Sequence, residues 1–225
     1  MYGSEMLYIK HDGSLPDGCE LVTHPMSPEF MMSEEGRRMW NDICDAAKAE
    51  GMRSHDTDTC GLHVHVSRDF FGKSGTSQEL TELKLIETVD RLFEPFVLFS
   101  RRKRHNINRW APKCNTPQSD DGWVKKAKIV SDYAKRDRYH AVNITNRSTI
   151  EFRLFRGTLK VETILATLQF ISGFCYLAKS LNPSQMNRIC WYDLCDAVME
   201  SCPVNCAELY EYLVERELIV PKGEN

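Results

Sequence analysis

The sequence lacks the features that mark membrane, secreted and nucleic-acid-binding proteins. Its 225 residues contain no uninterrupted apolar run near the roughly 20 residues that cross a bilayer. The first residues, MYGSEMLYIKHDG, lack the basic start and apolar stretch of a secretory signal, so we expect a cytoplasmic location. A formal net charge of −3 and an isoelectric point near 6.2 argue against a nucleic-acid partner, which usually requires a basic excess.

Cysteine pairs with metal-ligand spacing are missing as well. The nine cysteines are scattered and odd in number, and no Cys-x-x-Cys pair occurs, so we expect reduced thiols that pack as small apolar residues. The sequence has no Gly-x4-Gly-Lys-Ser/Thr loop, which excludes a P-loop nucleotide site. With 42% hydrophobic and 27% charged residues, the composition is that of one globular domain.

Hydrophobic periodicity predicts an α+β fold. Alternating apolar residues predict about five strands, near residues 7–10, 19–24, 60–67, 139–144 and 149–155. Helical spacing predicts helices over 33–51, 77–100, 159–181, 191–201 and 205–218. A kink is expected at Pro95, and residues 101–122 are expected to form a long loop. We expect the strands to form one antiparallel sheet backed by the long helices.

Two predicted strands carry paired polar side chains. His63 and His65 are two residues apart in GLHVHVS, so both leave the same face of the strand. In TIEFRLF, Glu151, Arg153 and Phe155 alternate with the apolar residues and are expected on one face. Each pattern also has an ordinary interpretation: a solvated strand face for the histidines, and a surface salt bridge for the Glu-Arg pair.

A third strand places a carboxylate, Glu20, among apolar neighbours, where it needs a structural reason. Together, Glu20, His63 and Glu151 offer two carboxylates and an imidazole on one predicted sheet, with Arg153 beside them. Mg²⁺ and Mn²⁺ prefer oxygen ligands, and arginine stabilises a phosphoryl group during transfer. This combination suits a metal site that binds nucleotide phosphates.

Three runs of the sequence resemble the amidoligase family of the glutamine synthetase and glutamate–cysteine ligase superfamily. The runs are DGS followed by GCELVTHP, then CGLHVHVS, then AVNITNRSTIEFRLFRGTL, and the resemblance covers roughly residues 7–160. It implies a curved antiparallel sheet, like that of glutamine synthetase, whose concave face holds ATP and Mg²⁺ or Mn²⁺. It also implies that a carboxylate is activated as an acyl phosphate, which an amine attacks to form an amide or peptide bond.

The resemblance also implies roles for individual residues. The metal ligands would be Glu20, His63 and Glu151. The catalytic residues would be Arg153 and Glu151. The nucleotide contacts would be His65, Arg156 and Asn143. The basic run Arg101-Arg102-Lys103-Arg104 and Tyr139 are weaker candidates for phosphate contacts, because a solvated loop explains the run better. The substrates would be a small-molecule or peptide carboxylate and an amine.

The resemblance implies a catalytic sheet domain over residues 1–160, with the helices of 161–225 packed on it. Family members usually begin with a strand carrying Gly-x-Glu-x-Glu, and no such strand can be built from MYGSEMLY. This leaves two other hypotheses open: a catalytically silent module that only binds, and a metal-dependent hydrolase that uses the His63-x-His65 pair. Nothing in the sequence indicates a subunit interface.

Overall fold

The computed structural model describes residues 6–11, 13, 18–73, 75–117, 119 and 122–221. The strands are β1 (Leu7–His11), β2 (Cys19–Thr23), β3 (Gly61–Ser67), β4 (Val142–Asn143) and β5 (Thr149–Arg156). The helices are α1 (Pro28–Met32), α2 (Glu34–Ala49), the 3₁₀ helix η1 (Arg68–Phe71), α3 (Gly75–Arg91), α4 (Phe93–Ser100), α5 (Arg104–Trp110), α6 (Trp123–Ala134), α7 (Val161–Ser180), α8 (Pro183–Met186), α9 (Trp191–Ser201) and α10 (Ala207–Glu215). The α+β prediction is confirmed, and all nine cysteines are free thiols.

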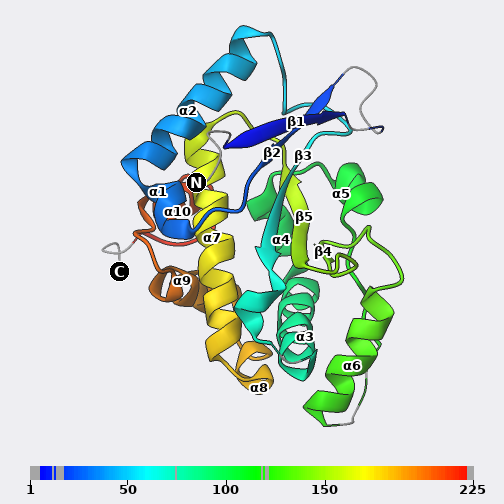
Figure 1. The fold of residues 1–225 in the computed structure, drawn as a ribbon. Helices are drawn as coiled ribbons and strands as arrows, with labels where there is room; N and C mark the ends of the chain where they lie inside the picture. The colour runs from blue at the N-terminus through cyan, green and yellow to red at the C-terminus, as the bar shows by residue number, and fades with distance from the viewer. Residues whose placement is uncertain are drawn as a thin grey trace.

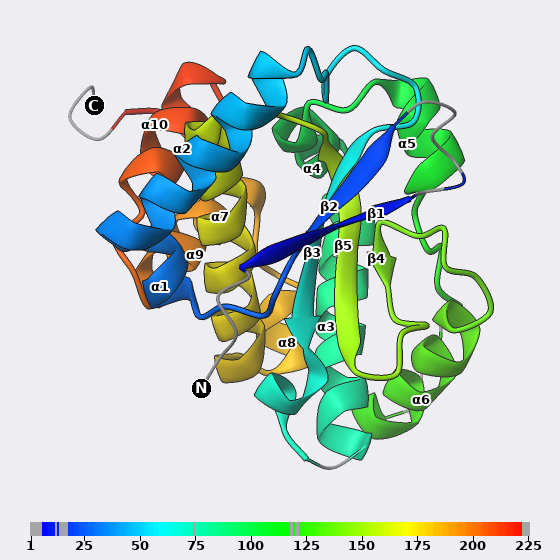
Figure 2. The ribbon, with the colours of Figure 1, turned by 45° about the horizontal axis from the view of Figure 1, so that its top comes forward.

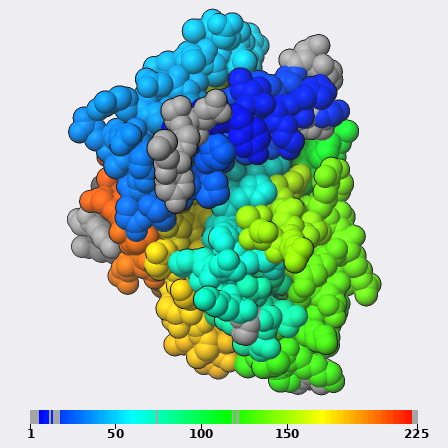
Figure 3. All heavy atoms as spheres, in the orientation of Figure 1, coloured from blue at the N-terminus to red at the C-terminus, as the bar shows by residue number. Residues whose placement is uncertain are grey.

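Within this described part of the chain the strands form two antiparallel sheets, so the prediction of a single sheet was wrong. β1 and β2 pair as a hairpin, and the second sheet has the order β3-β5-β4. In both ribbon views the hairpin crosses in front of β3 and β5 (Figures 1 and 2), and in Figure 3 its blue atoms lie against those strands. Alternation predicts a strand but not its pairing partner. β1 and β2 are neighbours in the sequence, so their pairing requires the closure of only a short loop. Asp12 and Ser14, which belong to the DGS run between the two strands, lie outside the described residues.

The inner face of the three-stranded sheet packs against α4 and α7. The ring of Phe99 in α4 lies 6.0 Å from that of Phe155, and the ring of Phe174 in α7 lies 6.2 Å from that of Phe152. Ile150, Phe152 and Leu154 are completely buried there. This apolar face fixes the register of β5, because a one-residue slip would expose all of these side chains. The polar side chains of β3 and β5 therefore leave the other face, toward the hairpin.

The helix predicted over residues 77–100 is two helices, α3 and α4, with a break at Leu92. Pro95 explains the break, because its ring would clash with the carbonyl of Arg91, four residues earlier, in a continuous helix. In the first turn of α4 the missing proline N–H costs no hydrogen bond. The sequence located the distortion correctly but described a break as a kink.

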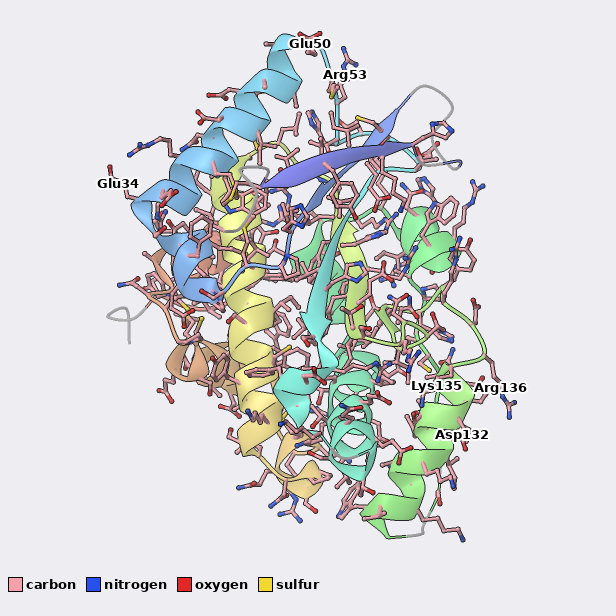
Figure 4. The ribbon with its side chains drawn as sticks, in the orientation of Figure 1. Glu34, Glu50, Arg53, Asp132, Lys135 and Arg136 are labelled. Carbon is pink, nitrogen blue, oxygen red and sulfur yellow. The ribbon has the colours of Figure 1, made fainter. Side chains whose placement is uncertain are left out.

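The chain between α4 and β4 is more helical than predicted, because it contains α5 and α6. In α6, Ala127, Val130, Ser131 and Ala134 are buried at helical spacing, and Ser131 donates to Glu82 of α3 at 2.8 Å. Small and polar residues give a weak hydrophobic signal, which explains why these helices were not predicted. Three charged residues labelled in Figure 4, Asp132 in α6 and Lys135 and Arg136 just after it, point outward and are exposed.

Helix α7 is long and apolar enough to span a membrane by length and composition, which the sequence analysis did not expect. However, 78% of its most apolar window is buried, as in the core helix of a folded domain. It contacts α2, α9 and α10, and its Phe170 stacks on Trp191 of α9 at 6.0 Å. The same hydrophobic core includes β5, so residues on both sides of position 160 share it.

Candidate functional site

Glu151 stands at the centre of the polar face because β5 is the central strand. Its cross-strand partners are His65 on β3 and Asn143 on β4, so the three residues form a row across the sheet. The Asn143 amide donates to Glu151 Oε2 at 2.7 Å, and the Asn146 amide in the following turn reaches the same oxygen at 3.3 Å. Strand pairing alone thus brings His65 beside Glu151 and Asn143, which lie far from it in the sequence.

A register irregularity in the β3–β5 pairing aims His63 at the same carboxylate. Leu62 pairs with Phe155 and Val64 with Phe152, so β5 has one extra residue opposite His63. Such a bulge re-aims the side chains around it. As a result, His63 Nδ1 lies 3.1 Å from Glu151 Oε1, closer than the 3.7 Å of the directly paired His65 Nε2.

Glu151 is a buried and ionised carboxylate. Its side chain is only 6% exposed, and Arg153 donates to its Oε1 at 2.5 Å. Burial alone would raise the pKa of Glu151, but the hydrogen bond to His63, the charge of Arg153 and the bond from Asn143 outweigh it and lower the pKa to about 2. Glu151 therefore keeps its negative charge at neutral pH and holds the cluster together.

The surroundings of His65 differ from those of its neighbour His63. Its Nδ1 lies 3.1 Å from the hydroxyl of Thr149, which fixes the ring. Burial lowers the pKa of His65, partly offset by the charge of Glu151 and, more weakly, that of Glu20. His65 is therefore neutral at pH 7, and its neutral imidazole can accept a proton.

Two arginines meet beside Glu151. Arg153 lies over the ring of Tyr139 at 5.7 Å, and its backbone carbonyl accepts a hydrogen bond from Arg102 Nη1 at 2.8 Å. Arg102 is only 5% exposed, and burial together with the charge of Arg153 lowers its pKa to about 10. The Nε atoms of both arginines are buried without a hydrogen-bond partner. Buried donors of this kind call for an unseen acceptor, such as water or an anionic ligand.

Gly61 allows Arg102 and His63 to approach each other. A Cβ at position 61 would lie 3.1 Å from His63 Nε2 and 3.3 Å from Arg102 Nη1. These two groups therefore flank the same small space at the start of β3. A larger residue at position 61 would push apart the imidazole and the guanidinium.

Glu20 reaches this cluster from the hairpin rather than from the same sheet. Its carboxylate accepts a hydrogen bond from Lys10 Nζ at 2.9 Å, and its side chain is 37% exposed. The charge of Glu20 acts on the pKa of His65, so the two side chains are near enough to interact between the two sheets. The hairpin thus brings Glu20 near the site, but its carboxylate is paired with a lysine.

One residue of the predicted polar face and one predicted nucleotide contact lie elsewhere. Phe155 is 2% exposed and packs in the core, so its prediction was wrong: the bulge opposite His63 shifts the alternation of β5 beyond Arg153. Arg156, predicted to contact the nucleotide, lines a surface cavity with residues of α10 and the start of α7.

Comparison with known proteins agrees with this arrangement of motifs. The family model described as "Putative amidoligase enzyme" matches residues 7–175, which span the hairpin, the three-stranded sheet and most of α7. The chain belongs to this amidoligase family. No curated protein and no solved structure matches it significantly. Family membership indicates a ligase-type enzyme.

For an amidoligase, the predicted metal ligands are incompletely assembled. Within the part of the chain that the structure describes, no group of three or more His, Cys, Asp and Glu side chains is arranged to hold a metal ion. The oxygens of Glu151 already accept hydrogen bonds from Asn143 and Arg153, and Glu20 is paired with Lys10. Although oxygen and imidazole donors suit Mg²⁺ chemically, this arrangement of Glu20, His63 and Glu151 does not fit the ion.

Arg102 and Asn146 are two residues of the site that the sequence did not reveal. The sequence favours a solvated loop for the basic run 101–104, whereas Arg102 is buried beside the site of this amidoligase. Charge runs are usually solvated, and only the end of α4 at Ser100 turns Arg102 inward, where its backbone N–H donates to the Ser100 hydroxyl at 3.1 Å. Asn146 lies in the short turn that joins β4 to β5. This turn places its side chain near Glu151.

Proposed function

We propose that this protein is an ATP-dependent carboxylate–amine ligase. In the proposed reaction a substrate carboxylate oxygen attacks the γ-phosphorus of ATP, releasing ADP and forming an acyl phosphate. An amine then attacks the acyl carbon, releasing phosphate and leaving an amide or peptide bond. The substrates are a small-molecule or peptide carboxylate and an amine. Membership of the amidoligase family supports the ligase class.

The observation that carries the proposal is the unbalanced charge around Glu151. The buried guanidinium of Arg153 is paired with the carboxylate of Glu151, whereas the buried guanidinium of Arg102 donates to the backbone carbonyl of Arg153. The Nε of each arginine is buried without a hydrogen-bond partner. Isolated buried charge is costly, so a site of this kind favours an anionic ligand. A phosphoryl group is such a ligand, and arginine stabilises the charge that develops on it.

Each residue then has a defined task. Glu151 orients Arg153 and His63, while Arg153 and Arg102 bind the transferring phosphoryl group. Neutral His65, with its Nδ1 next to the Thr149 hydroxyl, lies near the phosphates and is suited to accept a proton from the attacking amine. Asn143 keeps the Glu151 carboxylate in place, and a direct contact of Asn143 with the nucleotide stays a prediction.

We also propose that the reaction depends on Mg²⁺ or Mn²⁺, as the resemblance implies. Such an ion would reduce the charge of the nucleotide phosphates when bound. Glu20, His63 and Glu151 would be its protein ligands only after the carboxylates leave their present partners. A sheet curved like that of glutamine synthetase and a cytoplasmic location belong to the same proposal.

The test measures ADP release from ATP with mixtures of carboxylates and amines, and hydroxamate formation with hydroxylamine as the acceptor. Hydroxylamine traps an acyl phosphate, so the proposal expects hydroxamate in the wild type. Glu151→Gln should lower both signals by at least about a hundredfold, because Arg153 loses its anchor. The control is Glu34→Gln, the same chemical change at an exposed position of α2, shown at the edge of Figure 4. Equal signals in wild type and Glu151→Gln would refute the catalytic claim.

A second candidate is an amidoligase-like module that binds nucleotide without turnover. The incomplete set of metal ligands in the described residues favours it. Calorimetry separates the two: ATP binding that requires Arg153 but is never followed by ADP release would establish the binding module. The hydrolase that uses His63 and His65 lacks such support, because both imidazoles are directed at a carboxylate.

A further inference from the structure

A second basic site lies at the junction of α4, β5 and α10. A cavity of about 340 Å³ is lined there by Arg101, Arg156, Lys160, Tyr212, Glu215 and Arg216. Four of these six residues are basic and one is acidic, in a chain whose formal net charge is −3. The positive charge is therefore a local concentration, and the volume is at the lower end of the range for small-molecule sites.

Hydrogen bonds and ring packing fix the residues at the base of this cavity. The Tyr212 hydroxyl donates to the carbonyl of Phe99 at 2.6 Å, and the two rings lie 5.2 Å apart. Arg101 ends α4 in the left-handed region, with φ 58°, a conformation that non-glycine residues rarely adopt. Its Nη1 then donates to the Thr163 hydroxyl in the first turn of α7 at 3.1 Å. Its neighbour Arg102 points instead to Arg153, so consecutive arginines serve two different sites.

The positive charges in this cavity are only partly compensated, because one acidic residue, Glu215, stands against four basic ones in its lining. None of the ion pairs found among the described residues joins Arg101, Arg156, Lys160 or Arg216 to a carboxylate. Arg156 Nε is in addition buried without a hydrogen-bond partner. Lys160 is the N-terminal cap of the 20-residue helix α7, so the positive end of the helix dipole lies at the rim. Like charges repel, and a bound anion would relieve this repulsion.

We propose that this cavity binds a compact polyvalent oxyanion through Arg101, Arg156, Lys160 and Arg216. The shared ligand chemistry is two or more negatively charged oxygen groups a few ångströms apart, as in a diphosphate or a tricarboxylate. An arginine guanidinium can donate two parallel hydrogen bonds to the oxygens of either a phosphate or a carboxylate. The site is independent of the proposed ligase reaction.

Calorimetric titration with inorganic pyrophosphate, citrate and acetate tests the proposal, in metal-free buffer at two salt concentrations. We expect one-to-one binding of pyrophosphate or citrate, and the stronger of the two identifies the phosphate or carboxylate source. Acetate should bind far more weakly. Arg156→Gln should weaken binding about tenfold to a hundredfold, the range for one charge-assisted hydrogen bond. Lys160→Gln, an exposed change that leaves the base intact, should weaken it severalfold.

Two further variants complete the test. Arg38→Gln removes the same charge from an exposed position on α2 and should leave the affinity unchanged. Glu151→Gln should also leave it unchanged, whether or not the ligase activity exists. Absence of binding at millimolar ligand, equal weakening by Arg38→Gln, or loss through Glu151→Gln but not Arg156→Gln would each overturn the proposal.

Discussion

Glu151 and Glu20 are both strand carboxylates, yet the two sheets give them opposite surroundings. Glu151 lies on the central strand of the three-stranded sheet, with a side chain 6% exposed and hydrogen bonds from Asn143, Asn146 and Arg153. Glu20 lies on the two-stranded hairpin, with a side chain 37% exposed and an ion pair to Lys10. The same residue type is an anchor in one sheet and a surface group in the other.

The difference shows how sheet position decides what a carboxylate can do. A central strand supplies neighbours on both sides, so Glu151 is surrounded by donors that are fixed by strand pairing. Water competes for an exposed ion pair such as Lys10–Glu20, which leaves Glu20 free to exchange partners at little cost. Glu151 is therefore suited to hold other side chains still, and Glu20 to respond to a ligand.

The largest expected effect comes from removing the buried carboxylate. Glu151→Ala leaves Arg153 buried without its partner carboxylate, which should lower the free energy of unfolding by about 3–5 kcal/mol. Urea denaturation measures this loss. The double variant Glu151→Ala/Arg153→Met removes one stranded charge and should recover part of it. If the double variant is no more stable than the single one, the cluster is not held by this charge pair.

Acid should remove the same stabilisation without any mutation. The pKa of Glu151 is lowered from 4.5 to about 2 in the folded protein, which corresponds to about 3 kcal/mol. Because the unfolded chain binds this proton more tightly, the stabilisation is complete above about pH 4.5 and is lost as pH falls toward 2. The difference in unfolding free energy between wild type and Glu151→Gln should shrink over that window. A difference that stays constant down to pH 2 would contradict the assignment.

Several elements that the sequence predicted correctly follow from local patterns. Alternation in GLHVHVS identified β3 and the outward direction of His63 and His65. The helix predicted over residues 33–51 is α2, and its start is also set locally: the Ser33 hydroxyl accepts the Gly36 N–H at 3.1 Å, and Glu34 and Glu35 follow in the first turn. Such signals act over a few residues and do not depend on the rest of the fold.

What the sequence did not reveal depends on contacts between distant segments. No local pattern shows that, among the described strands, β2 pairs only with β1, or that β5 gains a bulge that buries Phe155. The burial of Arg102 depends on the end of α4 meeting β5, and the cavity around Arg156 depends on α10. These are effects of tertiary structure, and they moved two of the arginines to places that the sequence did not indicate.

The smallest effect on stability, and the sharpest test of the comparison, is expected at Glu20. Glu20→Gln breaks only an exposed ion pair and should change the free energy of unfolding by about 0.5 kcal/mol or less. If Glu20 leaves Lys10 to bind the proposed ion, the same change should raise the Mg²⁺ concentration needed for half-maximal ADP release. Lys10→Met, which removes the competing cation, should lower that concentration. Identical Mg²⁺ titrations for wild type and both variants would restrict Glu20 to the surface of the hairpin and leave Glu151 as the one acidic residue of the proposed site.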